Sequence, residues 1–212
     1  MGALTQTTPK PLLHAANRPL IDHALDLPQA AGCPVQVVNL HTHADQLREH
    51  LRGKPNVTPV FEPELLETGG GLKAALPVLG DGPVFTLNTD AVWTSTTAFQ
   101  ILINAWDPDR MGALLLLVSP ARAHGHKGAG DFTLRANGQI TRPGPLIYTG
   151  AQLIDPAGLH DIDQDAFSLN VYWHKLADQG RLFGVEYDGD WADAGTPDGL
   201  KTATDLWNSR HV

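Results

Sequence analysis

Two aspartates, each at the end of an apolar segment, are the side chains of this sequence best suited to hold a metal ion. Asp90 ends the segment FTLNTD, and Asp193 ends the segment VEYDGDWAD. Ligands of open α/β sheets bind outside the carboxyl ends of the strands, where both carboxylates are expected. Mg²⁺ prefers one or two carboxylates, with phosphate oxygens and water as its other ligands. Aspartate is also common in ordinary turns, but the pair predicts a Mg²⁺ site.

Three successive glycines, residues 69–71, lie in the segment LLETGGGLKAAL. Without a Cβ, their backbone can approach a ligand closely, and the helix that follows would present free N–H groups. The spacing Gly69-x-Gly71-x-x-Ala74 also loosely fits a dinucleotide fingerprint, with Asp90 as its acid. That fingerprint requires a strand directly before the glycines, where this chain has EPELLET. An NAD-dependent oxidoreductase is therefore the weaker alternative to a phosphate-binding loop.

Lys10 lies between Pro9 and Pro11 in the segment TPKPL. The two prolines restrict the backbone on either side, so the lysine is expected on a stiff, extended segment. An ammonium group held in this way could contact phosphate, whereas a solvated surface lysine is the commoner case. Two histidine pairs, HTH from residue 41 and HGH from residue 124, suggest zinc ligands. With 10 histidines in the chain such spacings arise readily, so surface positions are favoured.

The overall composition limits the partners of the chain. Its 212 residues carry a formal net charge of −8 without a run of Lys or Arg, which argues against nucleic-acid binding. The longest apolar run, GALLLLV, is too short for a bilayer, which takes roughly 20 residues. The one cysteine, Cys33, is interpreted as an inert packing residue and excludes an intrachain disulfide. We predict a cytoplasmic protein, not bound to a membrane, whose phosphorylated substrates are small molecules.

Strands alternate with helices along the chain, which predicts an α/β fold with an open, mainly parallel sheet flanked by helices. Asn137-Gly138 divides an alternating segment and predicts a late β-hairpin insertion. No repeat or long linker divides the chain, so residues 1–212 are expected to form a single domain. Strands are predicted over residues 34–40, 56–63, 82–90, 112–118, 131–142, 145–155 and 181–189, and helices over residues 20–27, 43–51, 70–80, 96–107, 167–180 and from 197 onward.

Several motifs occur in an order that resembles one enzyme family. The segments TPKPLL, LETGGGLKAALPVLG, LNTD, YTGAQLIDP and GDWADAGTPDGL together resemble the sugar-1-phosphate nucleotidyltransferases. The resemblance is strongest to the bacterial N-acetylmuramate-1-phosphate uridylyltransferases, whose relatives are often named mannose-1-phosphate guanylyltransferases. It implies a Rossmann-like nucleotidyltransferase fold and a Mg²⁺-dependent transfer of a nucleotidyl group from a nucleoside triphosphate to a sugar 1-phosphate, with release of pyrophosphate. UTP and N-acetylmuramate 1-phosphate are favoured, and the oligomeric state stays open.

The resemblance also implies roles for individual positions. Lys10, Asp90 and Asp193 would be catalytic, with Lys10 on phosphate and the two aspartates on Mg²⁺. The residues implied on the nucleotide side are Lys10, Glu67, Gly69, Gly70 and Asn88, and those implied on the sugar side are Asp131, Thr149, Gly150 and Asn170.

Two departures from the family pattern bear on activity. Thr89 stands between Asn88 and Asp90, where the family usually has glycine. The family also begins with an apolar strand and a glycine-rich phosphate loop, and this sequence begins at the end of that pattern. We therefore expect a first strand to be missing from the sheet and activity to be impaired as written. A non-catalytic homologue that binds a sugar nucleotide or a partner is the second alternative.

Overall fold

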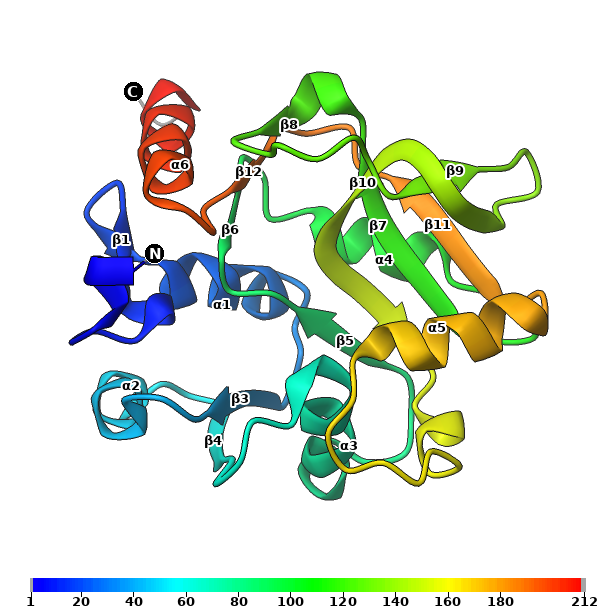
Figure 1. Ribbon diagram of the computed structural model, residues 1–212, viewed down its shortest axis with the longest axis horizontal. Helices are drawn as coiled ribbons and strands as arrows, with labels where there is room; N and C mark the ends of the chain where they lie inside the picture. The colour runs from blue at the N-terminus through cyan, green and yellow to red at the C-terminus, as the bar shows by residue number, and fades with distance from the viewer. Residues whose placement is uncertain (1, 211–212) are drawn as a thin grey trace.

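The computed structural model describes residues 2–210. Its helices are α1 Leu20–Ala30, α2 Ala44–Leu51, α3 Glu67–Leu79, α4 Ala98–Ala105, α5 Leu169–Asp178 and α6 Pro197–Arg210 (Figure 1). Its strands are β1 His14–Ala15, β2 Arg18–Pro19, β3 Gln36–Leu40, β4 Val57–Phe61, β5 Val84–Leu87, β6 Ala91–Trp93, β7 Ala113–Val118, β8 Ala123–His124, β9 Phe132–Leu134, β10 Ile140–Ile154, β11 Leu182–Glu186 and β12 Trp191–Asp193. Helices and strands alternate over most of the chain, which confirms the α/β class.

The central sheet has the order β11-β7-β10-β5, and β9 pairs with β10 beyond this path. β11 runs parallel to β7, but β10 runs antiparallel to both β7 and β5. The prediction of a mainly parallel sheet is therefore wrong in this detail, and the sheet is mixed. The cause is the predicted hairpin: the chain turns at Asn137-Gly138 and returns as β10, so β10 enters the sheet in the reverse direction.

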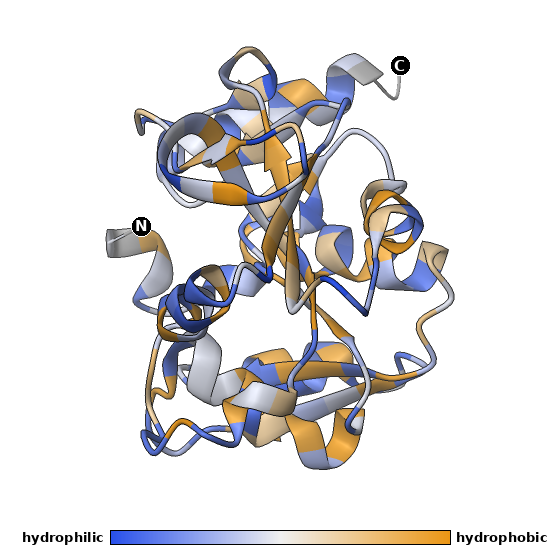
Figure 2. Cartoon of the chain, turned by 90° about the vertical axis from the view of Figure 1, so that its right-hand side faces the viewer, coloured by the Kyte–Doolittle hydropathy of each residue, from blue (hydrophilic) through white to orange (hydrophobic). Residues whose placement is uncertain are grey.

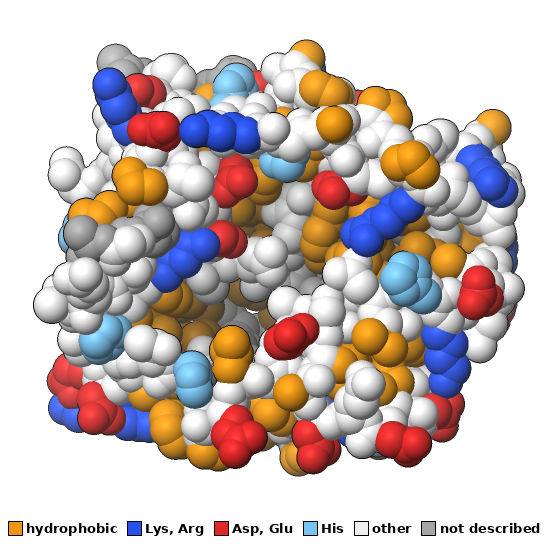
Figure 3. Space-filling model, viewed as in Figure 1, with side chains coloured by type: hydrophobic (Ala, Val, Ile, Leu, Met, Phe, Trp, Pro, Cys, Tyr) orange, Lys and Arg blue, Asp and Glu red, His pale blue; other side chains and the backbone are white. Residues whose placement is uncertain are grey.

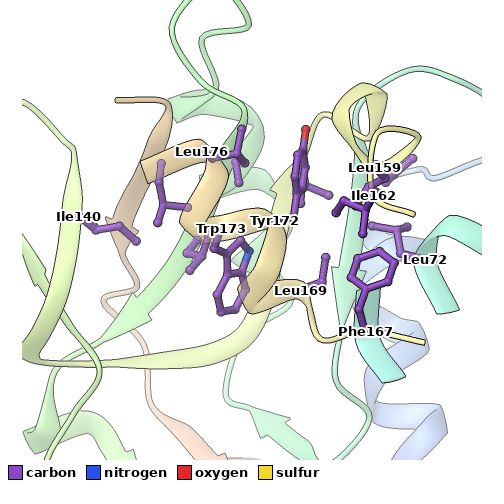
Figure 4. Packing of buried hydrophobic residues seen from close by; sticks show 14 of the residues in the cluster. Leu72, Ile140, Leu159, Ile162, Phe167, Leu169, Tyr172, Trp173 and Leu176 are labelled. Atoms are coloured by element: carbon purple, nitrogen blue, oxygen red, sulfur yellow. The ribbon is translucent and has the colours of Figure 1, made fainter. Parts of the chain in front are cut away.

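The core of the protein lies on both faces of β7, whose six residues are all buried. Leu115 and Leu117 face one hydrophobic cluster with α3 and α5, and Leu114 and Leu116 face a second cluster with α4. Figure 4 shows the first cluster, in which Leu72 of α3 lies beside Phe167 and Ile162, and Tyr172 and Trp173 of α5 belong to the same cluster. A strand covered on both faces reads as a continuous apolar run rather than an alternating one. Figure 2 shows hydrophobic residues gathered on these central strands.

A smaller sheet, ordered β6-β12-β8, carries the segments that follow β5 and β11. β12 pairs antiparallel with β6 and parallel with β8. β3 and β4 form a separate parallel pair. The prediction that a first strand and a phosphate loop are missing concerns positions outside the described residues, so it stays a prediction. Among the helices of residues 2–210, none is long and apolar enough to span a membrane.

Candidate functional site

Asp90 and Asp193 meet because β6 and β12 are paired. In this ladder Asp193 is opposite Ala91, and the N–H of Ala194 donates to the carbonyl oxygen of Asp90 over 2.8 Å. Gly195 lies between the two carboxylates. A Cβ on Gly195 would stand 2.8 Å from Asp193 Oδ1 and 3.3 Å from Asp90 Oδ2, so both oxygens border one small space. Pairing of two short strands thus brings together carboxylates about a hundred positions apart in the sequence.

Lys10 completes this group from the N-terminal part of the chain. It begins a short 3-10 turn, Lys10–Leu12, in which the N–H of Leu13 donates to the Lys10 carbonyl. Its Nζ lies 2.5 Å from Asp90 Oδ2, and both side chains are about one-third exposed (36% and 31%). The same Nζ lies 3.6 Å from the position of a Gly195 Cβ. All three residues predicted to be catalytic therefore converge. Figure 3 shows one face of the molecule, which is hollowed at its centre and carries basic and acidic side chains around the hollow.

The space at Gly195 gives a direct test of this geometry. A methyl group from Gly195→Ala would press on Asp193 Oδ1 and lie against Asp90 Oδ2. Because displacement of reacting groups by about 1 Å can cost about 100-fold in rate, we expect kcat/KM for pyrophosphate release to fall about 10- to 100-fold. The matched control is Gly82→Ala, since a Cβ at Gly82 would meet nothing within 4 Å. Equal activity of the two variants would contradict the assignment of this space to the reaction.

The donor set at this site fits Mg²⁺ rather than a metal held entirely by protein. Asp90 and Asp193 supply two carboxylates, which is what Mg²⁺ takes when phosphate oxygens complete its octahedron. Within residues 2–210, no cluster of three or more His, Cys, Asp or Glu residues could hold a metal. One histidine of each pair has another contact: His124 Nε2 lies 3.0 Å from Asp190 Oδ1, and His41 Nδ1 lies 2.9 Å from the Glu62 carbonyl oxygen. Burial raises the pKa of the Cys33 thiol, which agrees with its interpretation as unreactive.

The glycine-rich segment lies inside α3 and packs against the segment before α5. Glu67 is exposed, has a φ of +60°, and is the first residue of α3, so the glycines belong to the first turns of the helix. The N–H groups of Gly69 and Gly70 both donate to the carbonyl oxygen of Phe167, over 2.8 and 3.1 Å. These two amides are therefore already occupied, and a nucleotide contact by the two glycines stays a prediction. Glycines within the helix also do not match the dinucleotide fingerprint, in which they precede it.

The residues predicted on the sugar side lie along β10 and at the start of α5. Gly150 has a φ of +85°, and its missing Cβ makes room for Asn88, whose N–H donates to the Gly150 carbonyl over 3.0 Å. Asp131 Oδ2 accepts from the N–H of Tyr148 over 2.9 Å, next to the irregularity that bends β10 between Tyr148 and Gln152. Thr149 is 1% exposed, and its hydroxyl donates to the carbonyl of Leu116, so its side chain points into the sheet.

Asn170, at the start of α5, leads to a residue that the sequence analysis missed. Its Oδ1 accepts a hydrogen bond of 2.8 Å from Arg142 Nη1. The guanidinium of Arg142 also lies over the rings of Phe132 and Trp173. Nothing in the local sequence singled out Arg142, because a charged residue on a β-hairpin is ordinarily a solvated one. Only the folding of β10 against α5 places it beside a predicted sugar residue.

Solved structures with the same fold are nucleotidyltransferases and related proteins. UDP-glucose pyrophosphorylase, solved with UDP-glucose, superposes with a TM-score of 0.78 over 100% of this chain and 94% of that chain, at 14% identity. HddC from Yersinia pseudotuberculosis superposes with a TM-score of 0.76 over 97% and 92% of the two chains, at 17% identity. At these identities the likeness establishes the Rossmann-like nucleotidyltransferase fold.

Sequence similarity defines the family more closely. The model of the MobA-like NTP transferase domain matches residues 1–154. N-acetylmuramate alpha-1-phosphate uridylyltransferase from Caulobacter vibrioides is 38% identical over 211 residues, which span 93% of this chain and 87% of the relative. The protein of the same name from Neisseria meningitidis serogroup B is 32% identical over 97% and 92%. Mannose-1-phosphate guanyltransferase from Aspergillus fumigatus is 28% identical over 96% and 60%. The chain belongs to the MobA-like NTP transferase family, as a sugar-1-phosphate nucleotidyltransferase.

Proposed function

We propose that this protein transfers UMP from UTP to N-acetylmuramate 1-phosphate and releases pyrophosphate. The observation that carries the proposal is the convergence of Lys10, Asp90 and Asp193 around Gly195. Two relatives at 38% and 32% identity bear the name of this activity, and both are covered over most of their length. UTP is a metabolite of the cytoplasm, so the proposal includes a cytoplasmic location.

The chemistry is an in-line displacement at the α-phosphorus of UTP. A phosphate oxygen of the sugar 1-phosphate forms the new P–O bond, while the bond from the α-phosphorus to the bridging oxygen breaks and pyrophosphate leaves with its electron pair. No covalent enzyme intermediate is needed, so the protein contributes positioning and charge stabilisation. Mg²⁺ held by Asp90 and Asp193 would neutralise charge on the phosphate oxygens. Lys10, paired with Asp90 in this structure, would exchange that partner for a phosphate oxygen.

The remaining predicted residues divide between the two substrates. Glu67, Gly69, Gly70 and Asn88 are proposed on the nucleotide side, and Asp131, Thr149, Gly150 and Asn170 on the sugar side. The contact between Asn88 and Gly150 supports the proposal that the two substrates adjoin, because it joins a nucleotide-side residue, two positions before Asp90, to a sugar-side residue. For Gly69 and Gly70 the role must be indirect, because Phe167 already occupies their N–H groups.

The test is pyrophosphate release from pure protein supplied with Mg²⁺, one nucleoside triphosphate and one sugar 1-phosphate. We expect UTP with N-acetylmuramate 1-phosphate to give the highest kcat/KM in a panel that includes GTP and mannose 1-phosphate. EDTA should abolish release, and added Mg²⁺ should restore it. Pyrophosphate release only with GTP and mannose 1-phosphate would instead indicate a mannose-1-phosphate guanylyltransferase. Binding of UDP-N-acetylmuramate without any release would favour the non-catalytic homologue.

A further inference from the structure

Arg142 is held in place by neutral groups. Its Nη1 donates to Asn170 Oδ1 over 2.8 Å, and its Cζ lies 4.4 Å from the ring centroid of Phe132 and 5.5 Å from that of Trp173. A guanidinium over aromatic rings gains cation–π attraction, which orients the group without neutralising it. The position of this charge is therefore set by the fold, although the side chain is exposed.

The groups that hold Arg142 are themselves fixed by hydrogen bonds. Trp173 is 6% exposed, and its indole N–H donates to Gln152 Oε1 over 2.9 Å. Gln152 is fully buried and donates in turn to Thr86 Oγ1 over 2.9 Å. On the other side, Asn170 Nδ2 donates to Ser168 Oγ over 2.9 Å. The guanidinium is thus preorganised, so a ligand that binds it pays little of the usual entropy of ordering an arginine.

The charge of Arg142 has no acidic partner within residues 2–210. Two other basic side chains that are held in place differ in this respect, since Arg18 pairs with Asp26 at 2.5 Å and Lys10 pairs with Asp90 at 2.5 Å. Among the residues that the structure describes, no carboxylate forms an ion pair with Arg142, and guanidinium does not lose its proton in proteins. Its planar fork matches carboxylate and phosphate with two parallel hydrogen bonds. An oriented, exposed and unneutralised guanidinium is suited to an anion that comes from outside the chain.

The place of Arg142 indicates which anion this is. The sugar-side residue Asn170 bonds it directly, and Phe132 beneath it follows Asp131, another predicted sugar residue. The triphosphate is expected at Lys10, Asp90 and Asp193, on segments that Arg142 does not contact. Arg142 therefore lies on the sugar side of the site and not among the groups that carry phosphate. An anion at this position would belong to the sugar itself.

We propose that Arg142 binds a carboxylate on the sugar ring and selects acidic sugar 1-phosphates over neutral ones. The inference rests on the proposed function and deepens it. N-acetylmuramate carries a carboxylate in its lactyl ether, whereas N-acetylglucosamine has the same ring without that group. Discrimination between the two then depends on one preformed guanidinium. Asn170 acts as the positioning residue that aims it.

The experiment is calorimetric titration of the full chain with N-acetylmuramate 1-phosphate and with N-acetylglucosamine 1-phosphate, in the presence of Mg²⁺ and UMP. Because it measures binding, it does not require turnover. We expect Arg142→Gln to lower the affinity for N-acetylmuramate 1-phosphate about 10- to 100-fold, the range for a charge-assisted hydrogen-bonded pair. Binding of N-acetylglucosamine 1-phosphate should stay within about twofold. Arg142→Lys keeps the positive charge but loses the planar guanidinium. Its affinity for N-acetylmuramate 1-phosphate should lie between those of the wild type and Arg142→Gln.

Arg135→Gln is the matched control, since Arg135 is an exposed arginine on the same hairpin. It should leave both affinities unchanged. The role of Arg142 would be overturned if Arg142→Gln lowered the affinity for both sugar 1-phosphates equally. It would also be overturned if the wild type bound both with equal affinity. Failure of the proposed function has a different signature: no pyrophosphate release by the wild type, whatever the two affinities are. If Arg142→Gln lowers the unfolding midpoint, the ratio of the two affinities in Arg142→Lys decides instead.

Discussion

Replacing Asp90 by asparagine is expected to lower the rate of pyrophosphate release by about 10³-fold, the scale on which a charge-stabilising group acts in a closed site. The substitution keeps the shape of the side chain but removes the negative charge that faces Lys10 and borders the Gly195 space with Asp193. If Asp90 and Asp193 hold Mg²⁺ as proposed, loss of one carboxylate would weaken metal binding and leave the phosphate charge less neutralised. Steady-state rates over a range of Mg²⁺ concentrations should show a higher apparent KM for the metal.

Asp188→Asn is the matched control for this substitution. Asp188 is exposed and lies two residues after β11. Its replacement by asparagine removes the same charge from a position outside the group formed by Lys10, Asp90 and Asp193. Its rate should stay close to that of the wild type. Asp193→Asn should behave like Asp90→Asn, because the two carboxylates border the same space. Near-normal rates in both Asp90→Asn and Asp193→Asn, with unchanged Mg²⁺ dependence, would remove the metal assignment.

The second large effect concerns stability. Gly70→Ala is expected to lower the free energy of unfolding by about 3 kcal/mol, which is at the upper end for overpacking a filled site. The added Cβ would stand 2.0 Å from the carbonyl oxygen of Asp165, a backbone atom that cannot rotate away. Relief requires α3 to separate from the segment before α5, and that movement would break the two hydrogen bonds to Phe167. For a chain of this length, about 3 kcal/mol corresponds to a fall in Tm of about 6–12 °C.

Thermal unfolding by circular dichroism, with Gly82→Ala beside Gly70→Ala, measures this effect. The same Gly-to-Ala change at Gly82 meets nothing within 4 Å, so its Tm should differ from the wild type by no more than a few degrees. The comparison also tests what the glycines are for. An unchanged Tm together with a large loss of UTP affinity in Gly70→Ala would show that the segment meets the nucleotide directly, as the sequence alone predicts.

The apolar run of β7 and the turn at Asn137-Gly138 could be read correctly from the sequence because their signals are local. A strand buried on both faces is continuously apolar, and a tight hairpin turn favours glycine where φ is positive, as at Gly138 with a φ of +86°. The candidate metal ligands could also be identified from the sequence, since Asp90 and Asp193 each end a recognisable strand segment. The sequence therefore determined the α/β class, the hairpin and the three residues that converge around Gly195.

The tertiary structure decided the remaining features, because these features depend on which segments pack together over long separations in the sequence. The direction of β10 follows from where the hairpin returns to the sheet, and the hydrophobic periodicity of the sequence does not predict this. The sequence predicts that the amides of Gly69 and Gly70 are free donors. In the fold, both donate to the carbonyl oxygen of Phe167, about a hundred residues later. Arg142 reads as a solvated charge until β10 meets α5 and two aromatic rings come to lie beneath it. A side chain's chemical type is local, whereas the partners that orient it come from distant parts of the chain.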